Sequence, residues 1–151
     1  MNIIIRTSIP KNYQQVFSSF DISLFKALRP PFISLEVERF DGCQKGNEIH
    51  LKIGLGPISQ SWVSIITSDY KNDLENVFID EGKVLPKPLN YWKHTHKVIK
   101  KDENSCEIHD DIEYRTGNLF LDFLIYPVMF LQFYLRKPIY KKYFKGHKNA
   151  P

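Results

Sequence analysis

The chain has 151 residues, enough for one domain, predicted here over residues 1–151, to bury a core without disulfides or a structural metal. Its hydrophobic share of 42% is ordinary for a globular protein, and its formal net charge of +4 is uneven, because cations gather near the C-terminus. The two cysteines, Cys43 and Cys106, stand far apart and outside any CxxC pattern, which argues against a zinc knuckle, a redox motif and a disulfide framework.

The N-terminal residues predict a strand. β-Branched side chains fill residues 2–9, and Pro10 ends the run. The apolar stretch is too short for a signal peptide and contains Arg6, so we expect a cytoplasmic protein.

Two short helices and six strands follow. Pro10 can open a helix over residues 11–20, and Asp21 can cap a second one over residues 22–28, which ends before Pro30. Turn residues then separate six runs with strand character, at 32–40, 47–53, 59–70, 74–80, 91–100 and 106–114.

Residues 117–144 predict one long C-terminal helix, bent near Pro127. The segment is so apolar that most of its circumference must be covered. Its apolar part, about 17 residues, approaches the length that spans a bilayer, but Asp122 and Gln132 lie within it. A basic end, residues 136–151, follows and contains Arg136, Lys137, Lys141, Lys142, Lys145 and Lys148. We interpret these cations chiefly as a solvated helix end.

The last two strands alternate in a way that predicts one face against the helix. The alternate residues of the same two strands carry charges of both signs, which predicts that they face solvent. Such a mixture of charges disfavours nucleic-acid binding. The inward set is Trp92, His94, His96 and Val98 in one strand, and Cys106, Ile108, Asp110, Ile112 and Tyr114 in the next.

Six short segments occur in a characteristic order: residues 46–49, Trp62 with Ile66, 78–82, 92–96, 110–114 and 133–136. With these segments the chain resembles the helix-grip proteins, the superfamily of pollen-allergen-like, START-like lipid-transfer and polyketide-cyclase-like domains. It departs from that family at two places. The loop of residues 83–90 is longer and richer in proline, and residues 115–117 lack the proline that often starts the last helix.

The resemblance implies an α+β helix-grip fold: a curved seven-stranded antiparallel sheet around a long C-terminal helix, with two short helices after the first strand. Between sheet and helix it implies an elongated apolar cavity. The ligand-binding candidates are Trp62, Phe78, Asp80, Trp92, His94, His96, Asp110, Ile112, Tyr114, Phe120, Phe123 and Leu124, the last three with Phe130 as the cavity floor.

Several roles remain open for the inward polar residues His94, His96 and Asp110. They could act as acid and base on a bound carbonyl compound, orient a ligand, or bond to one another in a polar corner of the core. An H-x-H pair could also share a metal with Asp80 or Asp110, but no third ligand stands at a fixed spacing, so we predict no metal and no cofactor.

We therefore expect a protein that binds a small, mainly hydrophobic molecule, lipid-like, polyketide-like or aromatic. The alternative is a cyclase, dehydratase or hydrolase that uses His94 or His96 in the same cavity. A membrane-surface interaction module is a second alternative. No nucleic-acid partner is expected, and the oligomeric state stays open.

Overall fold

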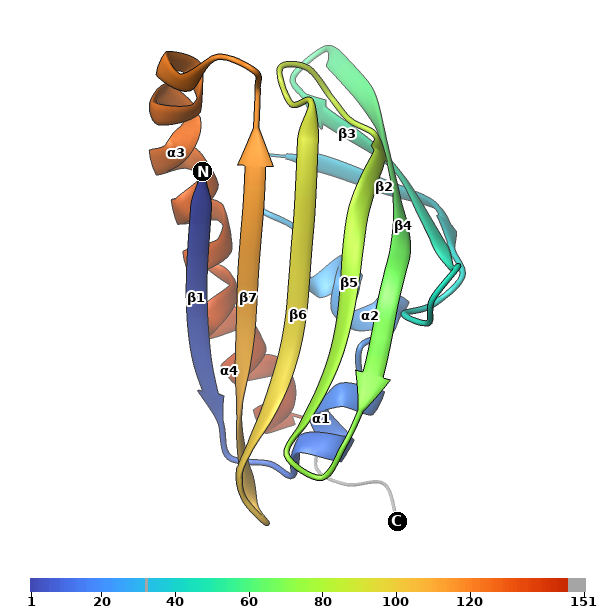
Figure 1. Cartoon of the computed structure of the whole chain (residues 1–151), viewed down its shortest axis with the longest axis vertical. Helices are drawn as coiled ribbons and strands as arrows, with labels where there is room; N and C mark the ends of the chain where they lie inside the picture. The colour runs from blue at the N-terminus through green and yellow to red at the C-terminus, as the bar shows by residue number, and fades with distance from the viewer. Residues whose placement is uncertain (32, 147–151) are drawn as a thin grey trace.

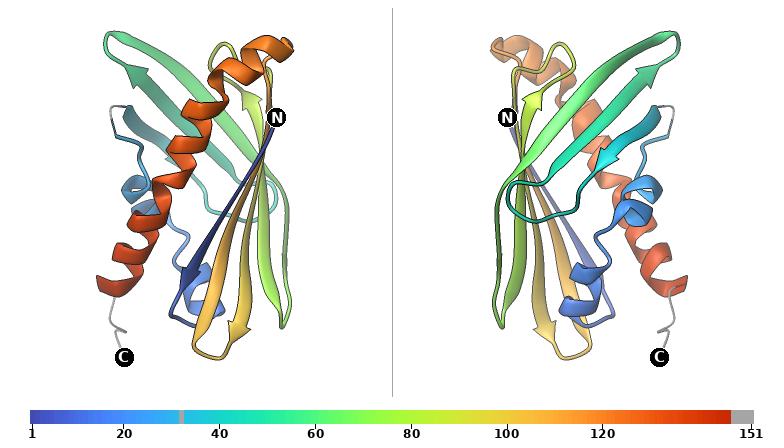
Figure 2. Two further views of the ribbon diagram at one scale, coloured as in Figure 1. Left: turned by 90° about the vertical axis from the view of Figure 1, so that its left-hand side faces the viewer. Right: turned by 90° about the vertical axis from the view of Figure 1, so that its right-hand side faces the viewer.

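The computed structural model describes residues 1–31 and 33–146, and for Leu55 only the backbone. Seven strands form one antiparallel sheet in the order β1-β7-β6-β5-β4-β3-β2. The sheet is strongly curved, and the C-terminal helices run across its open side (Figures 1 and 2). The elements are β1 (Asn2–Ile9), α1 (Tyr13–Ser18), α2 (Ile22–Ala27), β2 (Ser34–Phe40), β3 (Glu48–Leu55), β4 (Ile58–Lys71), β5 (Glu75–Val84), β6 (Tyr91–Asp102), β7 (Ser105–Arg115), α3 (Leu119–Tyr134) and α4 (Arg136–Gly146).

These elements confirm the predicted α+β helix-grip fold, with shifted boundaries. Helix α1 is shorter than predicted because Asn12, and not Pro10, is its N-cap: the Asn12 side chain accepts a hydrogen bond from Gln14 N. The predicted cap of α2 is confirmed, since the Asp21 carboxylate accepts from the backbone N–H groups of Ser23 and Leu24. Phe32, which the prediction assigned to a strand, lies outside the described residues.

The predicted alternation of β6 and β7 is confirmed. Every second residue is buried from Trp92 to Val98 in β6 and from Cys106 to Tyr114 in β7, and the register sets His96 opposite Asp110. On the other face, Lys97 and Asp111 form a cross-strand ion pair at 2.7 Å. Strand β5 then brings Asp80 opposite His94.

The C-terminal segment forms two nearly continuous helices, with Leu135 as the turn between them. The first turns of α3 run at an angle to the remainder of the C-terminal helices (Figure 2). Pro127 lies inside α3, in agreement with the predicted bend. Asn118 caps α3 by accepting from Leu121 N, so the missing proline is replaced by a side-chain cap.

Three clusters of buried apolar residues make up the core. In the first, Tyr140 and Phe144 of α4 pack with Val16 of α1 and Ile108 of β7. In the second, Phe133 of α3 packs with residues of β1, β6 and β7. The third joins β3, β4 and β5, and residues of the second and third clusters line the site described next.

Candidate functional site

A cavity of about 330 Å³ lies between the concave face of the sheet and the C-terminal helices. This volume is within the range of small-molecule pockets. Most of its lining is apolar and comes from the α2–β2 connection, β3, β4, the β5–β6 loop and α3. This lining includes Leu28, Pro30, Ile33, Leu35, Ile49, Leu51, Ile53, Trp62, Leu89, Trp92, Ile125, Val128, Met129 and Phe133.

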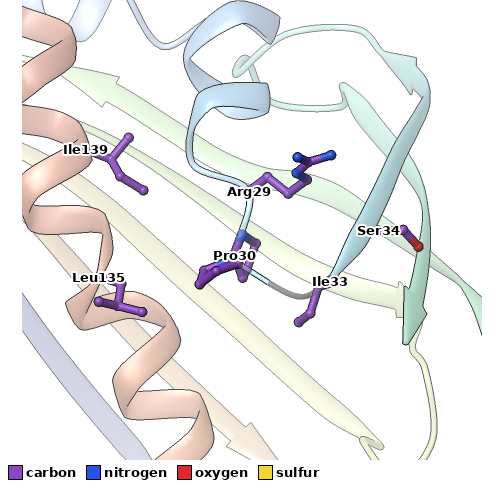
Figure 3. A pocket seen from close by; sticks show the side chains of 7 residues that line it. Arg29, Pro30, Ile33, Ser34, Leu135 and Ile139 are labelled. Atoms are coloured by element: carbon purple, nitrogen blue, oxygen red, sulfur yellow. The ribbon is translucent and has the colours of Figure 1, made fainter. Parts of the chain in front are cut away.

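An open groove lies next to the cavity, between the α2–β2 connection (residues 28–33) and the C-terminal helices. Arg29, Pro30 and Ile33 line both spaces. Figure 3 shows Leu135 and Ile139 on the helical side of this groove, facing these three residues. These three residues therefore separate the groove from the cavity.

Four buried polar residues form a corner of the cavity, which we call the polar corner: Asp80, His94, His96 and Asp110. His96 Nε2 lies 3.1 Å from Asp80 Oδ2, and His94 Nε2 lies 3.0 Å from Asp110 Oδ1. The two imidazole rings lie against each other with centroids 3.6 Å apart. Two interlocked carboxylate–histidine pairs result.

Three further side chains hold these pairs in place. Trp92 Nε1 donates a hydrogen bond to Asp80 Oδ1 at 3.1 Å. From α4, the Tyr140 hydroxyl donates to Asp110 Oδ1 at 3.4 Å, and Arg136 Nη1 lies 3.8 Å from the same oxygen. The C-terminal helix thus supplies one cation to a corner that the strands build.

Burial and neighbouring charge set the protonation of the polar corner. Burial, together with the charge of His96, lowers the pKa of His94 to about 4, although Asp110 opposes the shift. Burial alone would raise the pKa of Asp110, but the hydrogen bond from His94 and the charges of His94, Arg136 and His96 outweigh it and bring that pKa to about 2. The pKa of Asp80 is also lowered against the effect of burial, chiefly by His96. At neutral pH both carboxylates are therefore ionised and His94 is neutral.

The hydrogen bonds leave the polar corner with spare acceptors. Ionised carboxylates only accept, so each histidine donates from Nε2, and a neutral ring then presents a lone pair at Nδ1. His94 Nδ1 lies 3.8 Å from Asp80 Oδ2, and His96 Nδ1 lies 3.6 Å from Asp110 Oδ1. His96 Nδ1 and Asp110 Oδ2 are buried without a hydrogen-bond partner among the described residues. The corner holds two carboxylates, and the ion pair of Arg136 is with Asp110, so the corner favours a proton, a hydrogen-bond donor or a cation.

Among the described residues, Asp80, His94 and His96 could together hold a metal ion. Each offers one ligand atom, and these atoms lie within 4.8 Å of one another. The residue types suit zinc, and Asp80 Oδ2 lies 3.1 Å from His96 Nε2 and 3.8 Å from His94 Nδ1. The absence of a metal from the site stays a prediction.

The structure places five of the predicted ligand-binding residues in the cavity lining: Trp62, Asp80, Trp92, His94 and His96. The two tryptophans meet edge to face, with ring centroids 4.8 Å apart. Whether these residues bind a ligand stays a prediction.

The structure places the other predicted residues elsewhere. Phe78 lines a small space next to the cavity and stacks on His96. Asp110 is fully buried behind His94, and Ile112 and Tyr114 are part of the packed core.

The prediction that Phe120, Phe123 and Leu124 form the cavity floor is wrong. They are 77%, 62% and 63% exposed, on the side of α3 that faces away from the sheet. Phe130, predicted with them, is absent from the lining and 37% exposed. The inner side of α3 is lined instead by Ile125, Val128, Met129, Gln132 and Phe133, followed by Arg136 at the start of α4. Because α3 is apolar around its whole circumference, its sequence did not reveal which side faces inward.

Sequence reasoning also missed the α2–β2 connection and β3 as cavity walls. Apolar residues alternate in β3, with Ile49, Leu51 and Ile53 on one parity, so this signal was present. The position of Arg136 beside Asp110 depends on how α4 crosses the sheet, and no local pattern encodes it.

Comparison with known proteins supports the architecture. No family model matches the chain, and no curated protein matches it significantly. Among solved structures, norcoclaurine synthase from Thalictrum flavum in complex with dopamine and hydroxybenzaldehyde is 14% identical, with a TM-score of 0.67 over 99% of this chain and 89% of that one. The Zhui aromatase/cyclase from Streptomyces sp. R1128 is 11% identical, with a TM-score of 0.71 over 99% of this chain and 96% of that one. These similarities concern the fold alone: the chain has a helix-grip fold, in which a curved antiparallel sheet surrounds a C-terminal helix.

Proposed function

We propose that this protein binds a small, mainly apolar molecule whose polar end carries a hydroxyl or amino group. The observation that carries the proposal is the cavity between sheet and helices, with apolar walls and one polar corner. Pockets of this kind orient a ligand through a few fixed polar groups, while the apolar walls supply most of the binding free energy.

The polar end of the ligand is expected at Asp80 and His96. Both line the cavity as well as the small space beside it, and each side chain keeps about a tenth of its surface exposed. A hydroxyl or amino group can donate to the Asp80 carboxylate. Arg136 also lines the cavity with a partly exposed side chain, so a hydroxyl oxygen could accept from its guanidinium.

Two known structures agree with this proposal at the level of fold. The norcoclaurine synthase structure contains dopamine and hydroxybenzaldehyde, and another structure of that enzyme contains a transition-state analogue. Those ligands belong to that enzyme. For the present chain they support the idea that this fold can hold a small molecule.

The test is native mass spectrometry of gently purified protein, followed by organic extraction and identification of any bound compound. The compound found, or an apolar fluorescent probe if none is found, is then titrated against Leu51→Trp, which fills the cavity. Ile4→Trp is the matched control, because Ile4 is 58% exposed on β1. Binding should be lost in the Leu51 variant and kept in the Ile4 variant. Equal affinity in both would refute the cavity as the binding site.

An enzyme is the second candidate, and the His96–Asp80 pair favours it. Asp80 and His96 both line the cavity and share a hydrogen bond, so the pair could accept a proton from the bound molecule and return it. His96→Ala should then abolish turnover with the fold intact and with ligand affinity changed only modestly. In a pure binding protein the same variant would alter affinity alone, and no product would form with the intact protein.

A further inference from the structure

The side of α3 that faces away from the sheet is apolar and uncovered. We call this surface the outer face of α3. Four of its aromatic and leucine side chains are more than 60% exposed, whereas Phe133 on the inner side is 1% exposed. The outer face consists of Leu119, Phe120, Phe123, Leu124, Val128, Leu131 and Tyr134.

An exposed apolar surface of this kind requires an explanation. Large contiguous apolar patches on soluble proteins usually mark a surface that binds a protein or a membrane. A helix that is apolar around its whole circumference is normally covered on every side. The sheet covers only the inner side of α3, so a second surface is needed for the outer face.

Lysines extend this surface along α4. Lys141, Lys142 and Lys145 are exposed, and no ion pair joins them to an acidic side chain in the described part of the chain. Leu135, between the two helices, keeps a right-handed helical conformation, so at 3.6 residues per turn these lysines fall on the same side as Leu131 and Tyr134. The sequence contains no aspartate or glutamate from Phe123 to Gly146. The partner is therefore expected to be apolar near α3 and negatively charged near α4.

We propose that this surface docks on an anionic phospholipid bilayer. The outer face of α3 enters the boundary between headgroups and acyl chains, and the lysines of α4 contact lipid phosphates. Aromatic residues such as Phe120 and Tyr134 suit that boundary. A second copy of the chain would cover the apolar part, but it would bring the same lysines and no complementary charge.

The docking is peripheral. By length and composition the 28 residues Leu119–Gly146 could cross a membrane. However, Phe133, Tyr140 and Phe144 on the inner side are at most 3% exposed and hold the two helices against the sheet. A membrane-spanning position would remove these side chains from the first and second core clusters. The helices therefore lie on the bilayer with the sheet still attached.

The cavity borders the docking surface. Val128 lines the cavity and is also 65% exposed on the outer face of α3. An apolar molecule could therefore pass between the acyl chains and the cavity over a short path beside this residue. The docking itself does not depend on the identity of that molecule or on the proposed function.

The experiment measures co-sedimentation of the full chain with phosphatidylcholine vesicles, with and without phosphatidylserine, at low and high salt. The wild type should bind the anionic vesicles, and high salt should weaken the binding. Lys141→Glu with Lys142→Glu should reduce affinity by about 30-fold or more. Phe123→Asp should reduce it by a similar factor while the circular dichroism spectrum stays unchanged.

Matched controls separate this surface from general charge and hydrophobicity. Lys45→Glu with Lys52→Glu makes the same charge change on exposed sites away from the helices, and Ile4→Asp makes the same apolar-to-acid change on β1. Both should bind as the wild type does. Failure of the wild type to bind, or equal loss in the controls, would overturn the proposal. So would a dimer that Phe123→Asp converts to a monomer with vesicle binding unchanged.

Discussion

The buried imidazole of His94 predicts that the protein loses stability as the pH falls from about 6.5 to about 4. Burial and the charge of His96 lower its pKa in the folded protein, so the unfolded chain binds this proton more tightly. The contribution of the neutral His94 to stability is complete above the pKa that this imidazole has in the unfolded chain. It is lost as the pH falls through the lower pKa that it has in the folded protein. A pKa lowered from 6.5 to about 4 corresponds to about 3 kcal/mol in the free energy of unfolding.

The assay is urea unfolding of the wild type and of His94→Gln at several pH values across this window. The Gln amide can still donate to Asp110 but does not titrate. With a urea m-value of about 2 kcal/mol per molar, the wild-type midpoint should fall by about 1.5 M more than that of the variant. Thr95→Gln, on the opposite face of β6, is the control and should behave as the wild type. If the urea midpoints of wild type and His94→Gln fell in parallel as the pH is lowered, the reasoning would be refuted. An NMR titration that places the His94 pKa above 6.5 would refute it as well.

Two further predictions concern packing and charge. Asp110→Ala should lower the free energy of unfolding by about 3–5 kcal/mol at neutral pH. The reason is that His94 and Tyr140 lose a buried hydrogen-bond acceptor and Arg136 loses its counter-charge. A loss below about 1 kcal/mol in urea unfolding would contradict this prediction. Phe133→Ala should cost about 3–5 kcal/mol because it opens the core beside Trp92, whereas Phe123→Ala should change the unfolding free energy by at most about 0.5 kcal/mol. Equal thermal shifts for these two variants would show that the assignment of inner and outer sides is wrong.

The inward residues of the strands could be predicted because strand geometry is local. Successive side chains point to opposite faces, so one charged set identifies the solvent side and the other set must face inward. His94 and His96 were placed correctly by this rule, and so was Asp110. The caps at Asp21 and the bend at Pro127 are equally local, and they too could be predicted.

The residues of the C-terminal helix could not be assigned in this way. An amphipathic helix shows its buried side through a 3.6-residue period, but α3 is apolar on both sides. Phe120 and Phe123 were therefore assigned to the cavity, although Ile125 and Met129 occupy that position. Tertiary packing decides which side of α3 and α4 faces the sheet, as the contacts of Phe133 and Tyr140 in the core show.

The sequence by itself determined the order of the elements, the inward face of the last two strands and the presence of polar groups on it, because these follow from period and turn chemistry over a few residues. The tertiary structure alone decided that Asp80 meets His96, that Arg136 meets Asp110 and that one apolar side of α3 stays uncovered. These outcomes depend on the register between β5 and β6 and on the way the helix crosses a curved sheet. Both are set by contacts between residues far apart in the chain, which no local pattern records.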